Sequence, residues 1–101
     1  MITYREACAK IRAYVRNLSA LSALDLVVME ELTIERDFGW VFIYDVRKVA
    51  GGGASTTQIA GNSPLIVDRR NGSLHEAGTT YPVEHYIDNY EKYGDPFGPS
   101  V

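Results

Sequence analysis

Apolar residues recur near the N-terminus at intervals of three and four residues, the spacing of one face of an amphipathic helix. Thr3 and Glu6 have the spacing of a capping box, in which each side chain accepts a backbone N–H of the other residue. The pattern predicts a helix over residues 3–18, with its end left open between residues 19 and 25. The apolar positions are Tyr4, Cys8, Ile11, Val15 and Leu18.

Residues 38–44 form an uncharged run of aromatic and aliphatic side chains that includes the single Trp of the chain. Because side chains alternate between the faces of a strand, Trp40, Phe42 and Tyr44 share one face. The residues between them are also apolar, so neither face suits solvent. We therefore predict that this run is the central strand of a sheet, that it ends near Val46, and that Trp40 lies in the core.

The preceding segment, residues 26–35, has the composition of a strand that pairs with this central run. Its apolar face is interrupted at Glu30, which predicts a bulge or a change of register there. Residues 36–39 are short enough for a hairpin connection, and Gly39 supplies a positive φ.

A second hairpin is predicted over residues 65–77. Asp68 ends its first strand and is placed to accept backbone N–H groups of the turn that follows. Gly72 tolerates the left-handed conformation that closes such a turn. We favour the register that sets Val67 opposite Leu74, because it pairs apolar with apolar residues.

A short second helix follows, with Pro82 at its first helical position. Its apolar stripe is Val83, Tyr86, Ile87 and Tyr90, and it ends near residues 93–94. Residues 95–101, rich in Pro and Gly, are predicted to be a disordered tail.

The order helix, four strands, helix predicts an α+β fold: an N-terminal helix, a four-stranded antiparallel sheet built from two hairpins, and a short C-terminal helix. Residues 1–94 make a single domain. We expect both helices on one face of the sheet, which leaves the other face in need of a cover. Either residues 47–63 fold over it, or it is a partner surface that includes Tyr44.

Composition and charge limit the classes of partner. Hydrophobic residues make up 46% and charged residues 23% of the chain, as in ordinary globular proteins. The net charge is -3 and the basic residues are scattered, which argues against nucleic acid. No apolar run is long enough to span a membrane, and no signal peptide is visible. We expect a cytoplasmic protein, with homodimerisation left open.

The residues offer little for catalysis. His75 and Asp68 could face each other across the second hairpin, but no nucleophile accompanies them. One Cys and two His without short spacing do not make a metal site. The glycines at 51–53 lack the Lys-Ser/Thr of a phosphate-binding loop. We therefore predict no enzyme activity and no cofactor.

Acidic residues cluster on and just after the first predicted strand. Two interpretations stay open: a solvated strand edge that deters pairing with other chains, or a contact surface for a basic partner. The residues are Glu30, Glu31, Glu35 and Asp37.

The order and spacing of three segments resemble the YrhB-like family, known as immunity protein 35 of bacterial polymorphic toxin systems. They are residues 37–42, residues 60–68 with Gly72, and residues 78–87. The resemblance implies a non-enzymatic protein that binds and neutralises a cognate toxin, with a small chaperone-like or regulatory binding module as the alternative. It also implies structural roles for Gly39, Trp40, Gly72 and Pro82.

Overall fold

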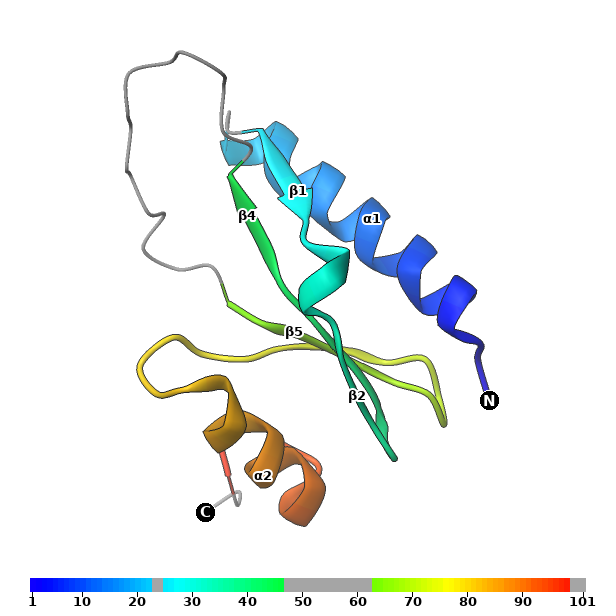
Figure 1. Ribbon diagram of the computed structural model, residues 1–101, viewed down its shortest axis with the longest axis vertical. Helices are drawn as coiled ribbons and strands as arrows, with labels where there is room; N and C mark the ends of the chain where they lie inside the picture. Colours follow the sequence, from blue (N-terminus) through cyan, green and yellow to red (C-terminus); the bar gives the residue numbers. More distant parts are fainter. Residues whose placement is uncertain (23–24, 47–62, 99–101) are drawn as a thin grey trace.

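The computed structural model describes residues 1–22, 25–46 and 63–98, and Figure 1 shows how their elements are arranged. The described residues form an α+β fold with an N-terminal helix, two antiparallel sheets and a C-terminal helix. A two-stranded sheet has the order β1-β4, and a four-stranded sheet has the order β2-β3-β5-β6. The elements are α1 (Tyr4–Ser22), β1 (Leu26–Val28), the 3-10 turn η1 (Glu30–Leu32), β2 (Ile34–Arg36), β3 (Gly39–Phe42), β4 (Tyr44–Val46), β5 (Leu65–Asp68), β6 (Leu74–Glu76) and α2 (Val83–Tyr93).

The capping box at the start of α1 is formed as predicted. The Thr3 backbone N–H donates to Glu6 Oε1 at 2.9 Å, and the Glu6 N–H donates to Thr3 Oγ1 at 3.1 Å. The helix continues past residue 18 to Ser22. Its buried residues are Ala7, Cys8, Ile11 and Val15.

The first two predicted strands are each split in two, so the prediction of a single four-stranded sheet was wrong. β1 and β2 are separated by η1, and β3 and β4 by Ile43. Within this turn the Thr33 N–H donates to the Glu30 carbonyl at 3.1 Å, so these groups do not take part in the hydrogen bonds of a sheet. The strand is therefore interrupted at Glu30, but by a 3-10 turn rather than by the predicted bulge or change of register. The Met29 N–H still reaches the Ile43 carbonyl at 2.8 Å across the break.

Glycines permit the close approaches that the two hairpins need. Gly39 has φ +149° and pairs with Asp68; a Cβ there would lie 2.0 Å from the Val67 carbonyl oxygen. Gly72 has φ +72° and donates its N–H to the Asp68 carbonyl at 2.8 Å. Val67 pairs with Leu74, which confirms the predicted register.

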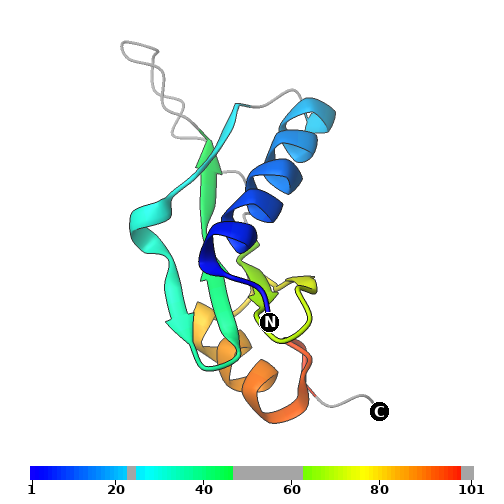
Figure 2. The ribbon, with the colours of Figure 1, turned by 90° about the vertical axis from the view of Figure 1, so that its right-hand side faces the viewer.

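The two helices cover opposite faces of the sheet, contrary to the prediction that they share one face (Figures 1 and 2). Trp40 and Phe42 pack in the cluster that contains the buried face of α1. Val41 and Ile66 pack with α2 on the other side. Because β3 and β5 are apolar on both faces, each face needs its own cover. Residues 47–62, which the sequence offered as an alternative cover, lie outside the described residues.

The second helix begins one residue later than predicted. Pro82 is its N-cap residue, with φ −59° and ψ 155°, and Gly94 ends it in the left-handed conformation. Of the predicted tail, residues 95–98 are described and form a turn against α2 instead of a disordered segment. The Asn89 side-chain amide donates to the Pro96 carbonyl at 3.0 Å and holds that turn in place.

Candidate functional site

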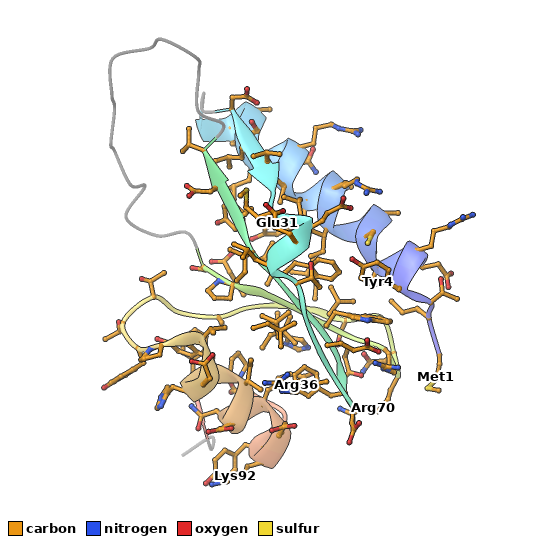
Figure 3. All side chains as sticks on the ribbon, viewed as in Figure 1. Met1, Tyr4, Glu31, Arg36, Arg70 and Lys92 are labelled. Atoms are coloured by element: carbon orange, nitrogen blue, oxygen red, sulfur yellow. The ribbon has the colours of Figure 1, made fainter. Side chains whose placement is uncertain are left out.

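Four exposed carboxylates follow one border of the four-stranded sheet, and we call them the acidic edge. Glu30 and Glu31 lie in η1, Glu35 in β2 and Asp37 in the turn that leads to β3. Within the described residues β2 pairs only with β3, so it is an edge strand. Figure 3 shows the position of Glu31 on η1. All four acidic residues of the run singled out from the sequence are thus exposed.

Two of these carboxylates are held by arginines from other elements. Glu30 pairs with Arg12 of α1, and Glu35 pairs with Arg69 at 3.1 Å. The Arg12–Glu30 pair is exposed on both sides, and such pairs contribute only about 0–1 kcal/mol to stability. In the second pair Glu35 is exposed but the Arg69 side chain is only 26% exposed. In the described part of the chain Glu31 has no ion pair. Among the described residues the edge therefore combines two carboxylates without an ion pair, Glu31 and Asp37, with one exposed pair, Arg12–Glu30, that a partner could replace at little cost.

Arg69 connects the acidic edge to the core. Its guanidinium carbon lies 4.8 Å from the ring centroid of Trp40, which is only 4% exposed. The same guanidinium donates to the Arg36 carbonyl at 2.9 Å, in addition to its bond with Glu35. This cation–π contact and these two hydrogen bonds fix the orientation of β2 relative to the central strand.

Tyr44, which the sequence placed on the partner surface, is 5% exposed and packs under α1. We therefore correct its assignment to the core. Tyr4 lies nearer the surface: its side chain is 44% exposed, and its ring stacks on that of Phe42 with the centroids 6.1 Å apart. The pKa of Tyr4 is raised, first by its side-chain interaction with Cys8 and then by burial.

Sequence reasoning missed Tyr4 as a surface residue because its spacing matches the buried stripe of α1. Leu32 is a second exposed apolar side chain, 50% exposed in η1.

A hollow of about 670 Å³ lies between α1 and β1. Arg12 and Glu30 belong to its lining, so the hollow and the acidic edge are continuous.

Asp68 is a buried carboxylate on the α2 side of the sheet, 1% exposed. As predicted, it accepts a backbone N–H of the turn, that of Arg70, at 2.8 Å. The Arg70 guanidinium donates to both carboxylate oxygens, and the Tyr90 hydroxyl donates at 2.7 Å. The Arg70 bonds, followed by that of Tyr90, lower the pKa of Asp68 well below its usual range. The Tyr90 contact was not predicted, because it depends on how α2 docks. The Arg70 side chain is only two residues from Asp68, but the sequence analysis considered only the backbone N–H groups of this turn.

The catalytic pair considered from the sequence is not formed. The backbone of Asp68 bonds to Ser73 rather than to His75, and the Asp68 carboxylate is occupied by Arg70 and Tyr90. His75 instead contacts the Ser73 hydroxyl at 2.8 Å. Among the described residues no group of three or more His, Cys, Asp or Glu side chains is placed to hold a metal ion. No helix in the described ranges has the length and apolar character to cross a membrane.

The amino-acid sequence was compared with those of known proteins and protein families. Residues 5–90 match the model of a family described as immunity protein 35. The chain belongs to the immunity protein 35 family. Its relatives include YrhB of Escherichia coli K12, described as an uncharacterized protein, which is 36% identical over 98 residues, 97% of this chain and 98% of YrhB. No solved structure matches the chain.

The residues that match the family include both of the charged features described above. The matched residues 5–90 of this immunity protein 35 member include the whole edge, both arginines that bind it, and the buried Asp68. Of these features, Asp68 is enclosed between the sheet and α2, so it belongs to the packing of the fold. The acidic edge is exposed, and its charged groups are accessible to a second protein.

Proposed function

We propose that this protein binds and neutralises a cognate bacterial toxin, and that the acidic edge forms part of the contact surface. The observation that carries the proposal is the match to immunity protein 35 over residues 5–90. A protein of this kind acts by protein–protein contact, so the proposal depends on an accessible surface rather than on a catalytic centre.

The acidic edge suits a basic partner for two reasons. Glu31 and Asp37 are exposed carboxylates with no ion pair among the described residues, so a partner gains their charge without displacing a cation. Complementary charge also raises the rate of association. Leu32 adds exposed apolar area beside the carboxylates of η1, and an interface commonly combines apolar area with a polar rim.

The test uses the open reading frame immediately upstream of the gene. We would express its C-terminal domain in a sensitive host with and without this protein, and measure growth and co-purification. The proposal predicts that growth is restored and that a stoichiometric complex is recovered. Toxicity without rescue or complex would contradict it, as would weak binding to many unfolded clients, which is the behaviour of a chaperone.

Charge reversal then tests the acidic edge. We expect Glu31→Lys to weaken the complex by about tenfold or more, because a carboxylate that attracts the partner becomes an ammonium that repels it. The matched control is Glu91→Lys, an equally exposed glutamate on α2. Lysine also deters pairing of strand edges. If Glu31→Lys weakens the complex and Glu91→Lys does not, the acidic edge contacts the partner, because the new lysine still deters strand pairing. If both variants weaken the complex equally, the acidic edge is not part of the interface.

A further inference from the structure

Four aromatic rings gather at the N-terminal end of α2, and we call them the aromatic platform. The Tyr81 centroid lies 4.4 Å from that of His85 and 6.3 Å from that of Tyr86. Tyr86 meets His85 edge-on at 5.2 Å and Phe97 edge-on at 5.9 Å. Tyr86 is buried, whereas Tyr81 is 56% and Phe97 66% exposed. His85 is exposed as well, so three rings are presented to solvent around a buried one.

The backbone that carries Tyr81 is fixed by the buried ring. The Tyr86 hydroxyl accepts the N–H groups of Thr80 and Tyr81, both at 3.1 Å. Gly78 also approaches this hydroxyl so closely that a Cβ there would lie 2.7 Å from it. The exposed Tyr81 ring therefore does not stand on a freely moving loop.

The backbone that carries Phe97 is fixed in a similar way. The Phe97 N–H donates to the Asp95 carboxylate at 2.9 Å, which closes a tight turn. Asn89 of α2 holds the same turn through the Pro96 carbonyl. A partner that contacts these two rings loses little of its binding energy to ordering them. Preorganised aromatic side chains of this kind are frequent anchors of interfaces.

The charges beside the platform indicate the chemistry of the partner. Glu84 and Asp88 are exposed and stand four residues apart on one stripe of α2, which Lys92 continues. His85 lies beside this stripe, three residues before Asp88. Aromatic faces attract cations through their quadrupole. Carboxylates next to such faces add a direct ion pair.

We propose that the aromatic platform, with Glu84 and Asp88, binds an arginine or lysine side chain in an exposed segment of a protein partner. The cation lies against the Tyr81 or Phe97 ring and pairs with a carboxylate of α2. The platform is separate from the acidic edge, and the inference does not require the partner to be a toxin. Each of the two proposals can therefore fail while the other stands.

The test is a titration of the full chain, followed by NMR, with the blocked tripeptide acetyl-Gly-Arg-Gly-amide. The control peptide replaces arginine by citrulline, which has nearly the same shape and no charge. We expect saturable shifts of the Tyr81, His85 and Phe97 ring protons with the arginine peptide only. We also expect the shifts to weaken as salt concentration rises.

Substitutions locate the site. Tyr81→Ala and Phe97→Ala should each weaken arginine-peptide binding about two- to fivefold, the loss of one exposed cation–π contact. Tyr81→Phe should retain binding because it keeps the ring, and Glu84→Gln should weaken binding without touching the aromatic packing. The control is Tyr93→Ala, which removes a tyrosine of α2 that is 52% exposed and has no ring contact among the described residues.

Three results would overturn the proposal. The first is equal binding of the citrulline peptide, which would mean that charge plays no part. The second is an equal loss with Tyr93→Ala, which would mean that any exposed ring of α2 suffices. The third is concentration-dependent shifts of the same rings without peptide, together with a dimer in analytical ultracentrifugation that Tyr81→Ala and Phe97→Ala dissociate. In that case the occupant is a second copy of this chain.

Discussion

The two faces of the four-stranded sheet are covered by different means. Under α1 the cover is a large apolar cluster centred on Trp40 and Phe42. Under α2 the apolar cluster is smaller, and a buried carboxylate, Asp68, lies at its border with Tyr90 and Arg70 bonded to it. Apolar packing is insensitive to pH, whereas a buried ionised group depends on its protonation state. We therefore expect the α1 face to supply most of the stability and the α2 face to supply its pH dependence.

The largest effect should come from the α1 face. Trp40→Ala removes a ring that is 4% exposed and packed in the cluster, and it leaves Arg69 without its aromatic contact. The expected cost is about 3–5 kcal/mol in the free energy of unfolding, from the lost contacts and the cavity. Urea denaturation followed by circular dichroism measures it. If the variant is as stable as the unmodified chain and loses only partner binding, Trp40 belongs to an interface and the comparison of the two faces fails.

The next effect belongs to the α2 face. Tyr90→Phe keeps the ring but removes the hydroxyl that donates to Asp68 at 2.7 Å. A buried charge that loses one hydrogen bond costs about 1–3 kcal/mol. Tyr14→Phe is the matched control on the other face, because the Tyr14 hydroxyl bonds to Glu76 at a more exposed site. Its cost should be smaller, and thermal melts of the two variants would show this; an equal cost would mean that burial of Asp68 adds nothing.

Acid should destabilise the α2 face through Asp68. Its pKa in the folded chain lies below the ordinary value of 3.8, chiefly because of Arg70. The stability that this provides is fully present above pH 3.8 and is lost as the pH falls toward the lowered pKa. The free energy of unfolding, measured from pH 6 downward, should thus fall less steeply with pH in Asp68→Asn than in the unmodified chain.

A control is needed because another carboxylate acts in the same direction. The pKa of Glu6 is also lowered, by the backbone and side-chain hydrogen bonds of the Thr3 capping box. Glu6 is exposed, so Glu6→Gln should reduce the loss of stability at low pH by less than Asp68→Asn does. A larger effect of Glu6→Gln would place the acid sensitivity in α1 rather than under α2.

Alkali should act on the hydroxyl of the same network. Burial, followed by the hydrogen bond to Asp68, raises the pKa of Tyr90 from 10.0 to about 12. The neutral form is therefore favoured by folding, and its contribution is complete below pH 10 and is lost as the pH rises toward 12. The pKa of Tyr14 is raised to about 12 as well, chiefly by its hydrogen bond to Glu76. Stability curves of Tyr90→Phe and Tyr14→Phe between pH 9 and 12 are therefore needed to separate the two faces.

Local patterns predicted the parts of the fold that local physics determines. The capping box at Thr3, the positive φ of Gly39 and the pairing of Val67 with Leu74 each depend on a few neighbouring residues. The division of the two helices between opposite faces does not. It follows only when α2 is docked, and the bond from Tyr90 to Asp68 spans 22 residues of sequence.

The candidate site was predictable to a similar extent. The acidic run is visible in the sequence, because its members are close neighbours in the chain. The pair between Glu35 and Arg69 joins residues 34 apart, so no local pattern indicates it. Tyr44 has the composition of both a core and an interface residue, and only the position of α1 shows that it is buried. The Phe97 ring was placed in a tail, since its turn depends on Asn89.

The smallest effect on stability should come from the acidic edge, and it separates folding from binding. Glu31 is exposed and unpaired among the described residues, so Glu31→Lys should change the free energy of unfolding by no more than about 0.5 kcal/mol. Chemical denaturation would measure this, with Glu91→Lys as the reference. A loss of stability comparable to that of Tyr90→Phe would show that the edge supports the fold. An unchanged stability, together with a weakened toxin complex, would mean that the carboxylate is retained for its partner.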